Sequence, residues 1–341
     1  MKTYTIRDIA SLAGVSVTTV SRVLNHRPDV NRETREKIEQ IIEECHFVGN
    51  TNARGLKQNS EVIGMVIRGR SNPFLNSLSE AILTRAADLE DTFITEYIDE
   101  KDDEFATALR LTRQHRIKGL LFVGSLIDDR VRAIHGMEIP VVFTTVNGEN
   151  ASLPRASSVS INDRALGRKV GESLWSFGHR KVAVFGSNPV AGDSLAMRFQ
   201  GFCDVWAEHG LSFPEDDYRE CRFSYESAYD AAREYFASHP RTTAVFAMSD
   251  SMAVGAVRAL TDLNLRVPED VSVVGFDGTA ISRFTVPRLA TVEQPIDEIA
   301  ANSLHLLLDM LENGAAPRNV LVDAFWRPRE SLAAPNPARI G

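Results

Sequence analysis

The stretch Ala13-Gly14-Val15-Ser16-Val17-Thr18-Thr19-Val20-Ser21-Arg22-Val23-Leu24-Asn25 has the pattern of a tight turn followed by a short amphipathic helix. Gly14 can adopt the positive φ that such a turn requires, and Ser16 is a favourable N-cap for the helix after it. From Val17 onward, apolar residues recur at intervals of three and four, which predicts one buried face. The outer face presents methyl and hydrogen-bonding groups that base edges in the DNA major groove can use. Its residues are Val17, Thr18, Ser21 and Arg22.

The residues before this turn predict another short helix. Thr5 and Asp8 have the spacing of an N-cap and its N3 partner, and apolar residues between Ile6 and Ala13 form one face. Two short helices joined by a tight glycine turn are typical of a helix-turn-helix, in which the second helix reads DNA. The pattern alone leaves open a helical hairpin inside a larger core, because such pairs also occur in unrelated folds.

A third helix is predicted from Arg32 to about Cys45, with Asn31 as its N-cap. The three helices together can bury only a small core, which is marginally stable on its own. Its expected members are Ile6, Ile9, Leu12, Val20, Val23, Leu24, Ile38 and Ile42.

After residue 60 the hydrophobic pattern changes. Residues 62–67 form a continuous apolar run, as in a buried parallel strand. Strand and helix patterns then alternate as far as residue 276, and a last strand is predicted over residues 320–325. Such alternation indicates βαβ units, with parallel sheets covered by helices on both faces. The alternation forms two series, so we expect two similar lobes.

The length of 341 residues predicts two or three domains. The hydrophobic fraction of 43% and the charged fraction of 25% are typical of globular proteins. No run of about eighteen apolar residues is present, so we expect no membrane span. The polar N-terminus lacks the apolar segment of a secretion signal, and we therefore expect a cytoplasmic protein.

The net charge of −8 at first argues against nucleic acid as a partner. Residues 1–60, however, carry nine Lys and Arg against seven Asp and Glu, and most of these acids lie between Glu33 and Glu44, away from Arg22. A small, locally basic unit on an acidic body is typical of a DNA-reading domain attached to another domain.

Several motifs resemble the lactose-repressor (LacI/GalR-type) family of bacterial transcription regulators, over about residues 3–330. They are Thr5–Ala10 with Val20–Asn25, Gly178–Val182, Met197–Phe202, Ser249–Ala253 and Val271–Asp277. The resemblance implies an all-α helix-turn-helix headpiece and an α/β core of the two-lobed, periplasmic-binding-protein type. In that core a ligand binds between the lobes, at the carboxyl ends of parallel strands.

The resemblance also implies the domain boundaries. We expect a headpiece over residues 1–48, a hinge helix or linker over 49–60, a core over 61–330 and a tail over 331–341. One lobe takes in about residues 61–160 and 291–320, and the other about 161–290 and 321–330. The tail has no leucine heptads for a tetramerising coiled coil, so we expect a homodimer.

The implied function is a sequence-specific transcription regulator, a repressor, which binds pseudo-palindromic operator DNA under the control of a small molecule, a sugar or sugar derivative. In the family, the hinge leucine wedges into a minor-groove base step, a role that falls on Leu56, although Gly49 stands where many relatives have Pro. The implied DNA-binding residues are Thr5, Ser16, Val17, Thr18, Thr19, Ser21, Arg22, Asn25, Asn31, Ala53, Arg54 and Leu56.

Strand-end residues supply the candidates for the effector site. Asp250 and Asp277 directly follow apolar strands, where a carboxylate can accept two sugar hydroxyls, and Arg198 presents a planar fork of donors. For any one of them a structural role remains open, such as a helix cap for Asp250 or a turn for Asp277. At Thr145 many relatives carry Asp or Arg, so known sugar specificities need not transfer. The implied effector-binding residues are Asn72, Phe74, Thr145, Arg198, Phe223, Ser249, Asp250, Asp277 and Gln294.

Motifs of the common enzyme classes are missing from the sequence. There is no GxGxxG after the first strand, no P-loop and no GxSxG turn. The three Cys and eight His lack the spacing of metal ligands. We therefore expect no enzymatic activity, metal or cofactor; the alternative is an enzyme or a solute-binding protein with the same two-lobed cleft.

Overall fold

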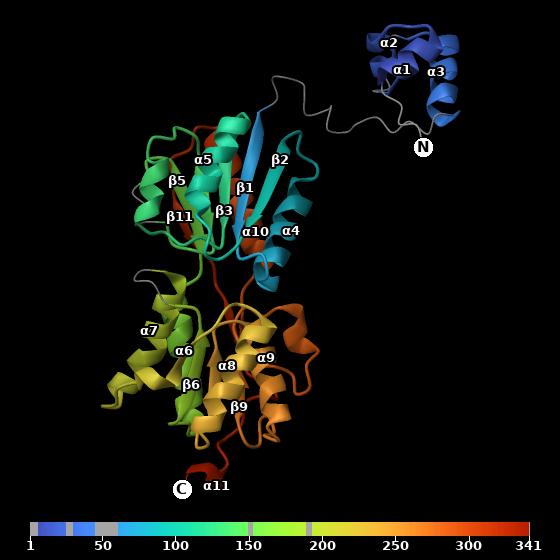
Figure 1. Cartoon of the computed structure of the whole chain (residues 1–341). Coiled ribbons are helices and arrows are strands. Elements are labelled where there is room, and N and C mark those ends of the chain that lie inside the picture. The colour runs from blue at the N-terminus through green and yellow to red at the C-terminus, as the bar shows by residue number, and fades with distance from the viewer. Residues whose placement is uncertain (1–5, 25–29, 45–60, 149–152, 189–192, 341) are drawn as a thin grey trace. The chain divides into compact units, whose positions relative to one another are not determined.

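The computed structural model describes residues 6–24, 30–44, 61–148, 153–188 and 193–340. The chain divides into two compact units, residues 1–60 and residues 61–341 (Figure 1). Among the helices of the described residues, none is both long enough and apolar enough to span a membrane.

The first unit contains α1 (Ile6–Ala13), α2 (Val17–Leu24) and α3 (Arg32–Glu44). Gly14 has a φ of +68° in the turn between α1 and α2, as its lack of a Cβ allows. The Ser16 hydroxyl accepts the amide hydrogen of Thr19 at 3.1 Å, and the Asn31 side chain accepts that of Thr34 at 2.8 Å. The predicted turn and the N-caps predicted at Ser16 and Asn31 are therefore confirmed, whereas Thr5, the third predicted N-cap, lies outside the described residues.

The core of this unit is small, as predicted, but Leu12 is not part of it. Leu12 is 54% exposed, whereas Ile9, Ala10 and Ala13 are buried. With 3.6 residues per turn, these three residues define a face of α1 that leaves Leu12 beyond its edge. The side chains of Ile6 and Leu24 lie outside the described residues, and Ile42 is half-buried. The other buried members are Val20, Val23 and Ile38.

The N-lobe of the second unit is a six-stranded parallel sheet with the order β11-β5-β4-β3-β1-β2. Successive β1 side chains alternate between two cores: Val62 and Val66 pack beside α5, and Ile63 and Met65 face the opposite layer. Its elements are β1 (Val62–Arg68), α4 (Pro73–Ala86), β2 (Thr92–Ile98), α5 (Glu104–Gln114), β3 (Ile117–Val123), η2 (Asp129–Ile134), β4 (Val141–Thr144), β5 (Ala156–Ser160), α10 (Ile296–Glu312) and β11 (Asn319–Leu321).

The C-lobe contains a four-stranded parallel sheet with the order β7-β6-β8-β9, and a short antiparallel pair, β10 and β12. Helices α6 and α7 pack against each other, as do α8 and α9. Its elements are α6 (Asp163–Phe177), β6 (Val182–Gly186), α7 (Ser194–Glu208), η4 (Glu215–Asp217), β7 (Tyr218–Glu220), α8 (Tyr225–Ser238), β8 (Ala244–Ala247), α9 (Asp250–Asp262), β9 (Ser272–Val274), η5 (Ala280–Arg283), β10 (Thr291–Glu293) and β12 (Phe325–Arg327).

The chain passes between the two lobes three times (Figure 1). It leaves the N-lobe after β5, returns after β10, and leaves again between β11 and β12. The single strand predicted over residues 320–325 is therefore wrong. β11 ends at Leu321 and pairs with β5, and β12 begins at Phe325 and pairs with β10. Residues 322–324 carry the chain from one sheet to the other, so they cannot continue either strand.

Helices α6 and α7 cross at direct backbone contact. A Cβ on Gly167 would lie 1.9 Å from the carbonyl oxygen of Arg198, and a Cβ on Gly201 would lie 1.9 Å from that of Arg164. Only glycine permits so close an approach at these two positions. The crossing consequently fixes the residues near the N-termini of both helices relative to each other.

The residues predicted as a separate tail begin inside the C-lobe. Ser331 is fully buried and Leu332 is 8% exposed. The Ser331 hydroxyl donates to the carbonyl oxygen of Val273 at 2.5 Å and accepts the amide hydrogen of Ala290 at 2.8 Å. The chain thus lies against β9 beyond residue 330, before it ends in α11 (Pro337–Ile340).

We expect Ser331→Ala to lower the free energy of unfolding by about 1–3 kcal/mol, because it leaves buried backbone groups without partners. Urea unfolding followed by circular dichroism measures this. Ser176→Ala, at an exposed serine on α6, is the matched control. Equal stability of the two variants would show that the hydrogen bonds of the Ser331 hydroxyl contribute nothing to the stability of the C-lobe.

Candidate functional site

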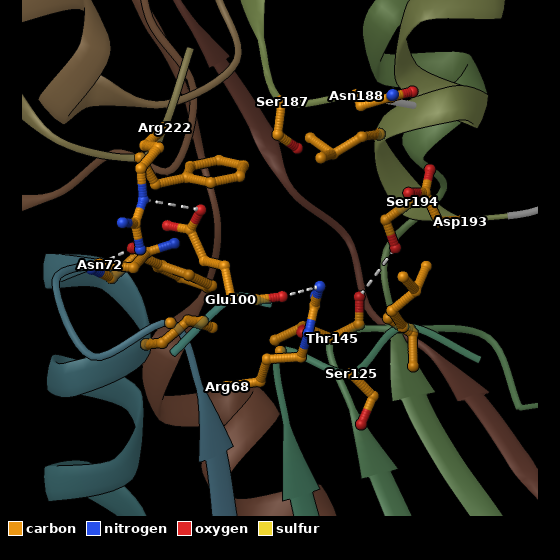
Figure 2. A pocket seen from close by; sticks show the side chains of 18 of the residues that line it. Arg68, Asn72, Glu100, Ser125, Thr145, Ser187, Asn188, Asp193, Ser194 and Arg222 are labelled. Carbon is orange, nitrogen blue, oxygen red and sulfur yellow. Dashed lines mark hydrogen bonds and ion pairs between the residues drawn. The ribbon is translucent and has the colours of Figure 1, made fainter. Parts of the chain in front are cut away.

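A cavity of about 570 Å³ lies between the two lobes, lined from both (Figure 2). Its size is within the range of small-molecule sites, roughly 300–1,000 Å³. The wall combines residues that follow the strands of both parallel sheets. Seven of the nine predicted effector-binding residues line it: Asn72, Phe74, Thr145, Arg198, Phe223, Asp277 and Gln294.

Arg198 is the buried cation of the C-lobe wall. Its Nε and Nη2 donate to Oδ1 of Asp163, at 3.1 and 2.7 Å, and its Nη1 donates to the carbonyl oxygen of Met248 at 2.8 Å. The guanidinium carbon lies 3.3 Å from the centre of the Phe276 ring. Burial raises the pKa of the Asp163 carboxyl, and the ion pair with Arg198 opposes that rise. These contacts fix the guanidinium plane against the cavity.

Asp277 is the carboxylate of the same wall and is 5% exposed. Its Oδ1 accepts a hydrogen bond from Nε2 of Gln294 at 2.9 Å. Among the described residues, no donor contacts its other oxygen. Burial raises the pKa of Asp277 well above its usual range, and the charge of Arg198 opposes this. A ligand that donates a hydroxyl to the second oxygen would complete the hydrogen bonding of this carboxyl.

Backbone strain is concentrated at this cavity. Three non-glycine residues of the described chain have a positive φ: Thr145 (80°), Asn264 (58°) and Asp277 (108°). Two of them, Thr145 and Asp277, line the cavity. Positive φ is costly for a β-branched residue such as Thr145, and strain of this kind clusters at binding and catalytic sites.

The N-lobe wall is built from the start of α4 and from the loop after β3. Asn72 caps α4 by accepting the amide hydrogen of Phe74 at 3.0 Å, and both residues are buried. Glu104 is fully buried, and its two oxygens accept the Ser125 hydroxyl and the Leu126 amide, each at 2.8 Å. Burial raises the pKa of Glu104. The carboxylate therefore holds the loop 124–126 in the wall.

Ser249 and Asp250 do not line the cavity, in contrast to their predicted role. Ser249 is the N-cap of α9. Asp250 is fully buried, and its oxygens accept hydrogen bonds from the Thr291 hydroxyl and from the amide and hydroxyl of Thr279, at 2.6 to 2.9 Å. Burial raises the pKa of Asp250 to about 6. Both oxygens are occupied, so Asp250 ties α9 to its neighbours.

Several wall residues were not predicted from the sequence. Arg68 is the last residue of β1, and Ser125 lies two residues after β3, so the strand-end rule that selected Asp277 could have found them. Asp163, which does not line the cavity but holds Arg198 in its wall, could not be found in this way, because an Asp at a helix start looks like a cap. The other polar wall residues that were missed are Glu100, Lys101, Ser187, Asn188, Asp193, Ser194, Glu220, Arg222 and Ser227.

The first unit carries the candidate DNA interface on α2. Val17 is 41% exposed, and Thr18 and Arg22 are exposed on the same helix. The Ser16 and Thr19 hydroxyls bond each other at 2.9 Å, and Asn31 caps α3, so these three also stabilise local structure. The predicted DNA-binding residues that lie outside the described residues, in whole or in their side chains, are Thr5, Ser21, Asn25, Ala53, Arg54 and Leu56.

Two family models match the chain. The model of bacterial regulatory proteins of the lacI family matches residues 5–50, and that of the periplasmic binding protein-like domain matches residues 171–332. The first match covers the helix-turn-helix, and the second covers most of the C-lobe and the return through the N-lobe.

Similar proteins match over almost their full length. The HTH-type transcriptional regulator MalR of Clostridium butyricum is 30% identical over 333 residues, which is 96% of this chain and 98% of MalR. The repressor PurR of Escherichia coli O139:H28 is 30% identical, over 96% of this chain and 97% of PurR. A lac repressor dimer bound to operator and the anti-inducer ONPF superposes with a TM-score of 0.71 at 26% identity, over 98% and 100% of the two chains. The complex of the regulator CelR with cellobiose gives 0.70 at 25%, over 96% and 99%.

We expect Gly201→Ala to lower the free energy of unfolding by about 1–3 kcal/mol, because an added methyl group must push α6 and α7 apart. It should also weaken binding of any ligand that contacts Arg198, since the crossing sets the position of that residue. Urea unfolding and calorimetric titration measure the two effects. Gly136→Ala, where a Cβ meets nothing within 4 Å, is the control. A Gly201→Ala protein as stable as this control would refute the role of the crossing.

Proposed function

Because this chain belongs to the lacI family of bacterial regulatory proteins, we propose that it is a transcriptional repressor whose affinity for operator DNA is controlled by a small sugar bound between the lobes. The observation that carries the proposal is the presence, in one chain, of a helix-turn-helix unit and a two-lobed core with a ligand-sized cavity. The similarity of the whole chain to regulators supports joining the two units in one function.

The charges of the wall favour a neutral effector that donates hydrogen bonds. Each of the three guanidinium groups there donates to a protein oxygen, Arg68 to the carbonyl of Glu100, Arg198 to Asp163 and Arg222 to Asp99, although the Nε of Arg68 has no partner among the described residues. The fourth cation, Lys101, is exposed. Asp277, by contrast, keeps one acceptor oxygen for the ligand. Hydroxyl groups satisfy such an acceptor, and Phe74 and Phe223 provide apolar surface for a sugar ring.

For DNA recognition we assign base contacts to the exposed face of α2, through Val17, Thr18 and Arg22. The residues predicted to form the hinge, 49–60, lie outside the described residues. For them we keep the hypothesis that Leu56 enters the minor groove and bends the operator.

We further propose that the protein acts as a homodimer on a pseudo-palindromic operator. The C-lobe exposes apolar side chains on η5 and just after it: Ile281 is 37% exposed, Phe284 is 78% exposed and Val286 is 93% exposed. An exposed cluster of this kind is typical of a subunit interface. Two symmetric headpieces require an operator with matching half-sites.

We infer that the protein has no catalytic activity of its own. Buried polar residues of the wall are oriented by contacts within the protein, as in Arg198 with Asp163 and Asp277 with Gln294. Such pairing suits binding and orientation of a ligand. Since a repressor must share a compartment with the chromosome, we place this function in the cytoplasm.

Arg22→Ala should relax the base preference at one symmetric position of the operator, because an arginine can donate two hydrogen bonds to guanine, worth about 1–3 kcal/mol of discrimination. A binding-site selection from random DNA, followed by sequencing, measures the preference. Ligand affinity of the variant should equal that of the wild type. An unaltered base preference would remove Arg22 from the reading face.

Asp277→Asn and Arg198→Ala should each weaken effector binding by about one to two decades, because hydrogen bonds to charged groups contribute about 1.5–3 kcal/mol. Calorimetric titration with cellobiose and ribose, with and without operator, measures the affinities. By linkage, operator must change effector affinity by the factor by which effector changes operator affinity. If operator leaves the wild-type sugar affinity unchanged, the proposed control of DNA binding fails.

A further inference from the structure

An ion pair joins the two lobes at one edge of the cavity. Nη2 of Arg222, in the C-lobe, lies 2.5 Å from Oδ2 of Asp99 in the N-lobe. Its Nε lies 3.6 Å from Oε2 of Glu100. Figure 2 shows Arg222 reaching Glu100 from the opposite lobe. Every other ion pair between described residues of the core stays within one lobe or its adjoining crossover strands.

Both ends of this ion pair are anchored. Oδ1 of Asp99 accepts the amide hydrogen of Lys101 at 3.2 Å, and the carbonyl of Glu100 accepts a hydrogen bond from Arg68. On the other side, the amide of Arg222 donates to the Ser227 hydroxyl at 3.0 Å. The pairing with Arg222 also lowers the pKa of Asp99. Neither end can follow the other if the lobes separate.

We propose that Arg222 is a positioning residue of the effector site: with Asp99 and Glu100 it forms a latch that holds this edge of the cavity closed before any effector binds. At the opposite edge the lobes meet through a neutral contact, in which the Ser194 hydroxyl donates to the carbonyl of Thr145 at 3.1 Å. The two edges therefore respond differently to salt, because only the latch is ionic.

The latch stabilises the closed arrangement of the lobes relative to the open one. It therefore raises the affinity for any ligand that binds the closed arrangement more tightly. This consequence rests on the proposed function. Even a neutral sugar should bind more weakly as ionic strength rises, since salt screens the latch rather than the ligand. The effect is modest, because exposed ion pairs contribute little individually.

Cys221 provides a native probe of the closed edge. It lines the cavity beside Arg222, is 5% exposed, and has a pKa that burial raises to about 12. Separation of the lobes exposes its thiol to reagents. Cys203, which is half-buried on α7 and does not line the cavity, reports on the rest of the C-lobe in the same sample.

The experiment measures alkylation of ligand-free, full-length protein by iodoacetamide, resolved by mass spectrometry at each cysteine. We expect Arg222→Gln and Asp99→Asn each to accelerate alkylation of Cys221 about two- to fivefold at low salt, with Cys203 unchanged. In the wild type, raising NaCl from about 0.05 M to about 0.5 M should have a similar effect. Arg258→Gln, which breaks an exposed pair within the C-lobe, is the matched control.

The double variant Arg222→Gln/Asp99→Asn separates pairing from local damage. If the latch exists, the effects of the two substitutions overlap, so the double variant reacts no faster than the faster single variant. Additive effects, or Cys221 rates insensitive to both salt and substitution, would overturn the latch.

A second arm repeats the measurement with cellobiose or ribose present. Protection of Cys221 in the wild type that weakens two- to fivefold in Arg222→Gln supports the coupling of latch and effector. Equal protection in both proteins would overturn that coupling. Failure of every tested sugar to protect wild-type Cys221 counts against the proposed effector class, whereas the ligand-free rates still decide whether the latch exists.

Discussion

The helix crossing at which Gly167 meets the backbone of Arg198 and Gly201 meets that of Arg164 is the constraint on which the effector site depends. Because neither helix has a side chain at the crossing, α6 and α7 approach until each glycine meets a carbonyl of the other helix. Asp163 begins α6 and Arg198 lies in the first turns of α7, so the same contact brings their charges together. The packing of two helices thus supplies a buried, oriented guanidinium that no local sequence feature could place.

Polar groups around the cavity divide into those that build the wall and those that are left for a ligand. Asp250 and Glu104 use both carboxylate oxygens internally, and each holds a loop in place. Asp277 has a similar position at a strand end but keeps an oxygen for the cavity. The backbone of Asp277 has a positive φ, which is a strained conformation for a residue other than glycine. Carboxylates of the same type therefore have different roles, which depend on how many donors surround each one.

The sequence predicted local features well, because the signals for turns, caps and alternating strands are themselves local. Gly14, Ser16 and Asn31 behave as expected for their residue types. The strand-end rule selected both Asp277 and Asp250. It takes no account of the donors around each carboxylate, and Thr279 and Thr291 already occupy both oxygens of Asp250. Arg222, two residues after β7, was also missed. Its partners Asp99 and Glu100 are more than 120 residues away in sequence, and only the assembled lobes bring them together.

The interleaved connectivity of the lobes has a consequence for the chain during synthesis. The N-lobe lacks its edge strand β11 until residue 321 has been made, and the C-lobe lacks β12 and the buried Ser331 until still later. The headpiece, in contrast, is a separate compact unit at the start of the chain. On the ribosome, where domains fold as they emerge, the DNA-reading unit precedes the sensing unit by nearly the whole length of translation. A nascent chain therefore completes the DNA-reading unit long before it completes the cavity that regulates DNA binding.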